Sequence, residues 1–246
     1  MRDIVGKDET LDILCGEQLK IIQKKKGYRF SIDSILLAAF VALKKHERLL
    51  DIGSGCGIIP IYIAKKGYRN TMTGVELQKD LYEVAQKNRM INSCEDHVQF
   101  INADIRTAVQ GMKKTPFHVI VSNPPYTKRR SGRTCPERSR FLARNEETLD
   151  LETLLSAASS LLIEKGRFSV IYPAHRAGEL VHEAQSQKLA LKRLRGVYPR
   201  RDEKANLVLA EFVKNGGVGA VIETPLYVYD GETLSTEVKN YYSFED

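Results

Sequence analysis

Two stretches of the chain combine residue types that could bind and orient a small molecule. One is Asp51-Ile52-Gly53-Ser54-Gly55-Cys56-Gly57 and the other is Asn123-Pro124-Pro125-Tyr126. Alternating glycines let a backbone turn tightly and approach a ligand with no Cβ in the way. The two prolines keep the second stretch stiff and extended, so that it offers a side-chain amide, backbone carbonyls and an aromatic face. That combination suits a planar group that carries an amino group.

Two further acids follow the glycine stretch at spacings that suit a nucleoside. Glu76 comes about 20 residues after Gly57, where a carboxylate in a nucleotide-binding fold meets ribose hydroxyls. Asp104 follows the next predicted strand, where it could accept from an adenine amino group. Each acid alone suits a solvated turn, and Asn-Pro-Pro alone only ends a strand. Together with a loop acid, Asp51, they trace an adenosine-sized ligand along one sheet edge.

Alternating strands and helices must position these residues. Apolar runs predict strands at 49–52, 72–76, 98–102, 117–122, 167–172, 191–197 and 207–213, and helices are predicted at 57–66, 79–92, 150–163 and 177–188. Repeated strand–helix–strand units give a parallel sheet with right-handed crossovers. The last two strands have no helix between them, so they pair antiparallel or lie apart. We therefore expect an α/β fold with a mostly parallel seven-stranded sheet and helices on both faces.

Smaller elements flank this unit at both ends. Alternating apolar residues over 10–23 predict a hairpin, and Ser31 or Asp33 can cap a helix that runs to about Leu43. Asp230-Gly231 predicts a second hairpin near the carboxyl end. We expect residues 1–46 to pack on the core, 47–215 to form the ligand-binding domain, and 216–246 to extend that domain.

Composition narrows the class of protein and its partners. The net charge of +7 and the pI of about 9.1 favour a polyanionic partner. No apolar run is long enough to span a membrane, and the first residues lack the core of a signal peptide. The four cysteines are far apart, which favours reduced thiols over a metal site or disulfides. These features predict a cytoplasmic protein that binds neither membrane nor metal.

Basic residues concentrate in two places. Residues 20–29 hold five bases and no acid, and residues 127–147, directly after Tyr126, hold seven bases against three acids. A charge run is usually a solvated face. The second run follows the amide-bearing stretch, so we expect four of its bases to contact a nucleic-acid substrate: Lys128, Arg129, Arg130 and Arg133.

The glycine stretch, the acids and Asn123-Pro124-Pro125-Tyr126 resemble the motifs of Rossmann-like class I S-adenosylmethionine-dependent methyltransferases. In that class the tetrapeptide marks methylation of an amino group. The resemblance implies S-adenosyl-L-methionine as the cofactor. Nearly the whole chain is similar to the tRNA1(Val) (adenine(37)-N6)-methyltransferases, including Gly27–Asp33 and Lys204-Ala205-Asn206. The cofactor contacts that it implies are Asp51, Gly53, Gly55, Gly57, Glu76, Asp104, Ile105, Phe30 and Asp33.

The same resemblance implies the catalytic residues. The Asn123 side-chain oxygen and the Pro124 carbonyl would accept the two N–H groups of the amine and direct its lone pair at the methyl group. Tyr126 would stack on a base flipped out of its surroundings. The implied partner is RNA, in particular tRNA beside the anticodon. The sequence does not set the oligomeric state, and a monomer is favoured.

Other functions share parts of this pattern. Protein-glutamine N5-methyltransferases use the same tetrapeptide but carry a helical amino-terminal domain. Guanine-N2 rRNA and adenine-N6 DNA methyltransferases use related motifs, and a non-catalytic RNA-binding module could keep the fold. A nicotinamide dehydrogenase is disfavoured because its glycine loop has a different spacing.

Overall fold

The computed structural model describes residues 4–27, 29–125 and 149–244. Its centre is a nine-stranded sheet in the order β10-β8-β9-β7-β6-β3-β4-β5, with β11 also paired to β8. The strands are β3 (Leu49–Ile52), β4 (Met72–Glu76), β5 (Val98–Asn102), β6 (Phe117–Ser122), β7 (Leu162–Pro173), β8 (Leu189–Tyr198), β9 (Leu207–Lys214), β10 (Val221–Ile222) and β11 (Leu226–Tyr227).

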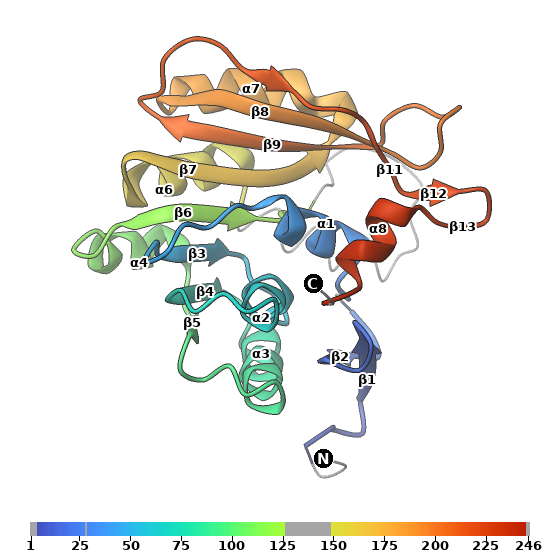
Figure 1. Cartoon of the computed structure of the whole chain (residues 1–246). Coiled ribbons are helices and arrows are strands. Elements are labelled where there is room, and N and C mark those ends of the chain that lie inside the picture. Colours follow the sequence, from blue (N-terminus) through green and yellow to red (C-terminus); the bar gives the residue numbers. More distant parts are fainter. Residues whose placement is uncertain (1–3, 28, 126–148, 245–246) are drawn as a thin grey trace.

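Helices cover both faces of this sheet (Figure 1). One face carries α1 (Ile32–Phe40), α2 (Ile58–Lys65) and α3 (Lys79–Ile91), and the other carries α4 (Ile105–Met112), α6 (Leu151–Leu161) and α7 (Ala177–Ser186). Successive strand residues point to opposite faces, so each strand feeds two apolar cores. Leu49 and Val119 belong to the core under α1 to α3, whereas Leu50 and Ile120 belong to the other.

The sequence-based prediction of the sheet is confirmed in its main part. All seven predicted strands form, β3 to β7 pair in parallel, and β8 pairs antiparallel with β9. The sheet is two strands wider than predicted, because the short β10 and β11 pair with β8 after the chain has left β9. Since two-residue strands carry no readable alternation, sequence reasoning had no signal for them.

Two α-helices in the described part of the chain were not predicted. In α4, Asp104 caps the first turn and Ile105 and Val109 pack into the core, but Gly111 in the last turn obscures the helical pattern. The six-residue α8 (Thr236–Tyr241) is shorter than the windows in which periodicity is read. The first helix also ends at Phe40, earlier than the predicted Leu43.

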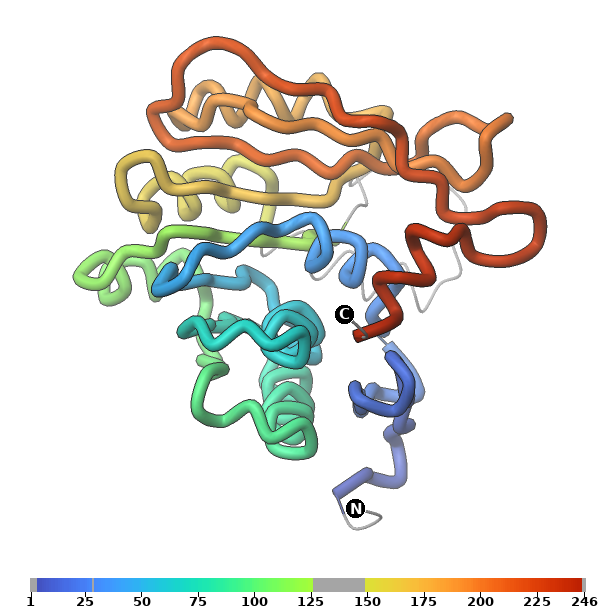
Figure 2. Tube along the Cα trace, in the orientation of Figure 1, coloured from blue at the N-terminus to red at the C-terminus, as the bar shows by residue number. Residues whose placement is uncertain are grey.

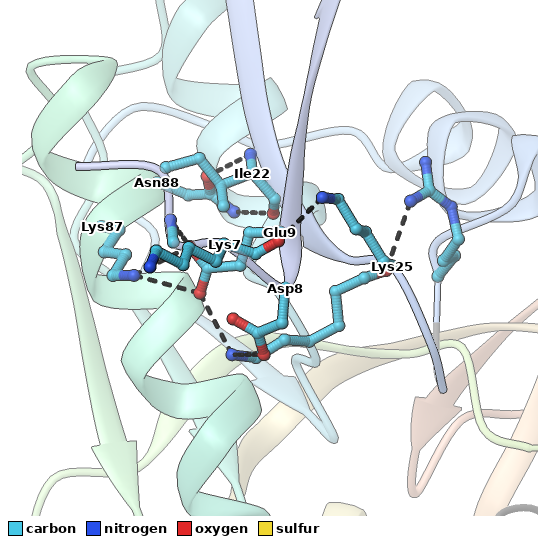
Figure 3. Close-up of polar contacts among 10 residues, drawn as sticks. Lys7, Asp8, Glu9, Ile22, Lys25, Lys87 and Asn88 are labelled. Carbon is cyan, nitrogen blue, oxygen red and sulfur yellow. Dashed lines mark hydrogen bonds and ion pairs between the residues drawn. The ribbon is translucent and has the colours of Figure 1, made fainter. Parts of the chain in front are cut away.

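The amino-terminal hairpin is docked on α3 through side chains of that helix. Strands β1 (Glu9–Leu14) and β2 (Leu19–Lys24) pair antiparallel, as predicted. Asn88 accepts from Ile22 N at 2.6 Å and donates to Ile22 O at 2.9 Å (Figure 3). One turn later, Asn92 makes the same pair of bonds to Lys20. The two asparagine side chains therefore form hydrogen bonds with the outer backbone groups of β2, as a third strand would.

The carboxyl-terminal segment returns across the sheet toward the amino-terminal half (Figure 2). The predicted hairpin forms as β12 (Tyr229–Asp230) and β13 (Thr233–Leu234). Helix α8 then packs against α1, and the Tyr62 hydroxyl of α2 donates to Tyr241 O at 2.6 Å. No helix in the described part of the chain is long and apolar enough to cross a membrane.

Candidate active site

The glycine stretch forms a tight loop between β3 and α2. Gly53, Gly55 and Gly57 adopt φ values of 74°, 55° and 83°, which residues with a Cβ rarely occupy. A Cβ on Gly57 would lie 2.4 Å from the Phe100 ring, so this glycine is also required by packing. Gly53 N donates to Val75 O at 2.9 Å, which holds the start of the loop against the end of β4.

Asp51 lies within β3 and is completely buried, which corrects its prediction as a loop acid. Neither of its carboxylate oxygens has a hydrogen-bond partner among the described residues, and the same holds for the buried Ser54 Oγ. Burial, together with the nearby charge of Glu76, raises the pKa of Asp51 well above its usual value. Buried polar groups are normally satisfied. A polar ligand over this loop would supply the missing partners.

Glu76 ends β4 with its carboxylate turned back toward the glycine loop. One oxygen accepts from Gly55 N and the other from Gln78 N, each at 2.8 Å. Burial raises the pKa of the carboxyl group, and these two N–H groups oppose the shift. Since each carboxylate oxygen can accept more than one hydrogen bond, both retain capacity for ribose hydroxyls. Glu76 thus shapes the loop and lies at its edge.

Asp104 is bonded to two groups of Arg106, which sequence reasoning did not foresee. Its carboxylate accepts from Arg106 N at 2.9 Å as the cap of α4, and the Arg106 guanidinium forms an ion pair with it. This guanidinium lowers the pKa of Asp104. Ile105 is buried in the core beneath it. An adenine contact by Asp104 or Ile105 stays a prediction.

Asn123 follows β6 and is tied to helix α1. Its Nδ2 donates to Ser34 Oγ at 2.9 Å, and Ser34 is 1% exposed. The preceding Ser122 donates its hydroxyl to Ile52 O at 2.8 Å, at the point where β3 enters the glycine loop. Pro124 is buried beside them. These two bonds bring the amide-bearing stretch and the glycine loop together at one sheet edge, as predicted from the parallel strands.

Other predicted site residues are placed less completely. Phe30 is half-buried and packs on the core that includes α1, with its N–H donating to Gln23 at 2.8 Å. Asp33 lies in the first turn of α1. Tyr126, Lys128, Arg129, Arg130 and Arg133 lie outside the described residues.

Two bases of the run at 20–29, Lys24 and Arg29, are paired with acids, which the sequence did not reveal. The pairing of β1 with β2 brings acids of β1 next to it. Lys24 pairs with Asp8 and Glu9 at 3.0 and 3.1 Å, and Arg29 pairs with Asp12 at 3.0 Å. Figure 3 shows Lys87 of α3 reaching the same buried Glu9, at 2.8 Å. Lys24 and Arg29 therefore belong to a structural ion-pair network.

Sequence reasoning missed three residues that hold the site together. They are Ser34, Ser122 and Asn88, whose Nδ2 also donates to Cys56 O in the glycine loop at 2.9 Å. Ser34 and Ser122 adjoin apolar runs, and Asn88 falls on the apolar face of α3, so a polar residue at a position that should be buried is the signal that could have singled them out. That signal identifies a buried polar group but not its partner.

The described cysteines are unsuited to covalent catalysis. Cys15, Cys56 and Cys94 are free and buried. Burial raises the pKa of Cys15 to about 11 and that of Cys56 to about 12, so both remain protonated thiols near neutral pH.

Comparison with known proteins gives a consistent picture. The family model of the methyltransferase small domain matches residues 29–179. A tRNA1(Val) (adenine(37)-N6)-methyltransferase from Tolumonas auensis is 31% identical over 78% of this chain and 79% of its own length. A protein of the same name from Porphyromonas gingivalis is 31% identical over 82% of this chain and 80% of its own.

Solved structures share the fold at low identity. A predicted O-methyltransferase from Agrobacterium tumefaciens superposes with a TM-score of 0.68 at 20% identity, covering 86% of this chain and 97% of its own. At this identity the likeness extends to the fold alone. It confirms the expected class I methyltransferase architecture.

Proposed function

Because the chain belongs to the methyltransferase small domain family, we propose that it transfers a methyl group from S-adenosylmethionine to N6 of an adenine in RNA, and specifically in tRNA next to the anticodon. The observation that carries the proposal is the placement of Asn123. Asn123 follows the end of β6, and its amide donates a hydrogen bond to Ser34 of α1. Ser122, the last residue of β6, donates a hydrogen bond to Ile52 O at the start of the glycine loop. The names of the relatives support the tRNA target.

The residues around the glycine loop suit this cofactor. Asp51 and Ser54 present buried oxygens without partners among the described residues, which suit a ligand that carries an ammonium group and hydroxyls. Glu76 lies at the loop edge with acceptor capacity for a ribose. When bound, S-adenosylmethionine supplies a methyl group activated by its sulfonium.

Asn123 and Pro124 would prepare the acceptor amine. The lone pair of an aromatic amine is delocalised into the ring, so the nitrogen is a weak nucleophile. If the Asn123 Oδ1 and the Pro124 carbonyl accept its two N–H groups, the nitrogen is drawn toward a tetrahedral shape and its lone pair faces the methyl group. The donation from Asn123 Nδ2 to Ser34 Oγ anchors the side-chain amide to α1. Positioning of this kind can supply much of the rate acceleration.

The amino-terminal part favours RNA over a protein glutamine as the acceptor. Residues 9–40 form a hairpin and one helix, instead of the helical domain expected of protein-glutamine methyltransferases. The net charge of +7 also favours a polyanion. Methylation of DNA and methylation of guanine N2 in rRNA are the alternative outcomes that the test distinguishes.

The test is nucleoside mass spectrometry of purified tRNA, rRNA and DNA after incubation with the protein and S-adenosylmethionine. We expect N6-methyladenosine in tRNA, and none when Asn123→Ala replaces the wild-type protein. The Asn123→Ala variant should bind the cofactor normally, because its contact matters as charge develops on the amine. Asn240→Ala, on the exposed side of α8, is the matched control. Methylation of N2 of guanine, or of DNA alone, would overturn the proposed substrate.

A further inference from the structure

Three tyrosines and two arginines gather beyond the carboxyl end of β8. The Arg201 guanidinium carbon lies 4.8 Å from the Tyr227 ring centroid, and that of Arg200 lies 5.6 Å from the centroid of Tyr229. The Tyr198 and Tyr227 rings are 5.6 Å apart and tilted by 47°. We name Tyr198, Arg200, Arg201, Tyr227 and Tyr229 the tyrosine–arginine cluster. Each arginine in the cluster lies over the ring of a tyrosine.

The backbone beneath the cluster is braced by three connections. Strand β11 pairs with β8, so that Tyr227 lies opposite Tyr198. Tyr229 N donates to Pro199 O at 2.9 Å, and Arg200 Nε donates to Gly231 O at 3.3 Å. These bonds join the β8–β9 loop to the β12–β13 hairpin. A partner that binds here meets rings that are already positioned, which lowers the entropic cost of binding.

Strand register places the cluster at the same sheet edge as Asn123. Ser122 pairs with Val170, Val170 pairs with Ala210, and Ala210 pairs with Leu194. Tyr198 follows Leu194 by four residues on a strand parallel to β6, so it lies about three residues, or about 10 Å, further along the strand direction than Asn123. Strands β8 and β6 are three strand spacings apart across the sheet, about 14 Å, so Tyr198 lies about 17 Å from Asn123 when both displacements are combined. Figure 1 shows the β8–β9 loop on the side to which β6 points.

The charge in the cluster is partly uncompensated. Arg200 pairs with Glu203 at 2.9 Å. Arg201 and Lys204 are exposed, and no carboxylate in the described part of the chain pairs with either of them. This differs from the amino-terminal run, where Lys24 and Arg29 face acids of β1. Arg201 thus combines an available charge with a position fixed by a ring.

We propose that the tyrosine–arginine cluster binds the RNA strand that flanks the methylated adenine, with Arg201 at a phosphate and the tyrosines against unstacked bases. The inference rests on the proposed function, since it takes RNA as the substrate. Single-stranded RNA is recognised by stacking on aromatic rings and guanidinium planes. A separation of about 17 Å between Asn123 and Tyr198, estimated from the strand spacing and the strand rise, corresponds to a few nucleotides of an extended strand.

The experiment compares two double variants that remove the same charge. Arg200→Ala with Arg201→Ala alters the cluster, and Lys113→Ala with Lys114→Ala alters exposed lysines at the opposite sheet edge, just before β6. For each protein, the dissociation constant for tRNA is measured across a salt series and the cofactor dissociation constant by calorimetry. A Tyr227→Ala variant tests stacking.

We expect the cluster variant to bind tRNA about tenfold more weakly, with a shallower salt dependence because fewer counterions are released. Tyr227→Ala should weaken binding on the order of tenfold without changing the salt slope. The lysine control should bind tRNA like wild type, and all variants should bind the cofactor normally.

Two failures are distinguishable. If wild-type protein methylates tRNA and the cluster variants bind tRNA with unchanged affinity, the cluster is not an RNA site and the proposed function stands. A wild-type protein that neither binds nor methylates tRNA would overturn the proposed function, and this inference with it.

Discussion

Asn88 offers a test of how the amino-terminal hairpin and the glycine loop are linked. Its side-chain amide forms hydrogen bonds with both the N–H and the carbonyl of Ile22. Its Nδ2 donates a third hydrogen bond to Cys56 O in the loop. Asn92, which follows the last residue of α3, forms the same two hydrogen bonds with the backbone of Lys20. Its third hydrogen bond goes to Asn88 O in the helix. The two residues therefore differ mainly in the contact with the glycine loop.

The magnitude follows from the groups left without partners. Asn88→Ala leaves the Ile22 N–H, the Ile22 carbonyl and the Cys56 carbonyl unsatisfied around a site that is completely buried. Each such group costs about 1–3 kcal/mol, so the free energy of unfolding should fall by at least about 3 kcal/mol. For a protein of this size that lowers the Tm by about 6–12 °C. Asn92→Ala removes as many bonds and should have a comparable effect.

Cofactor affinity separates the two variants. We expect Asn88→Ala to weaken S-adenosylmethionine binding about tenfold, since one hydrogen bond to the loop is lost. Asn92→Ala should change it less than about twofold on the same scale. Calorimetry on folded samples, below the first sign of melting, gives both values. If the two variants bind the cofactor with equal affinity, Asn88 does not position the loop and serves only to dock the hairpin.

Three further outcomes follow from the site. Glu76→Ala should weaken S-adenosylmethionine binding by about 10- to 150-fold, because hydrogen bonds to a charged acceptor are worth about 1.5–3 kcal/mol; wild-type affinity in calorimetry would remove Glu76 from the cofactor site. Asp51 has a raised pKa in the folded state, so its contribution to stability is present below its unfolded pKa and lost as pH rises through the folded value. The Tm of Asp51→Asn, measured without cofactor, should therefore rise relative to wild type between pH 4 and pH 8, and a constant difference would contradict this. Gly57→Ala should lower the Tm through its φ of 83° and the clash with Phe100, and adding Phe100→Leu should recover part of the loss.

The sequence predicted the central sheet well because burial and chain order determine it. Runs such as Phe117–Ser122 and Leu49–Ile52 are apolar enough to be buried on both faces, and helices between them leave only parallel pairing. The sequence could not predict β10 and β11. Each has only two residues, and each forms because it pairs with the edge of β8.

The site was predicted in part for the same reason. Strand ends gather at one edge, so Asp51, Glu76 and Asn123 were expected to be neighbours. The partners of these residues were not readable, because they depend on contacts between distant segments. The acids opposite Lys24 and Arg29 illustrate this, since the charge run carries no acid of its own but gains several through β1.

Three buried side chains connect separate segments at the sheet edge that carries Asn123 and the glycine loop. Their hydrogen bonds indicate that these segments form one rigid unit. Ser122 fastens β6 to β3, Ser34 joins α1 to Asn123, and Asn88 joins β2 to the glycine loop. Each bond uses a side chain at most 1% exposed, where a lost partner is costly. A hairpin attached only through ion pairs could shift with salt, whereas these bonds are shielded from screening. The amino-terminal segment is therefore a structural part of the candidate active site, and its removal should impair methyl transfer even if the sheet still forms.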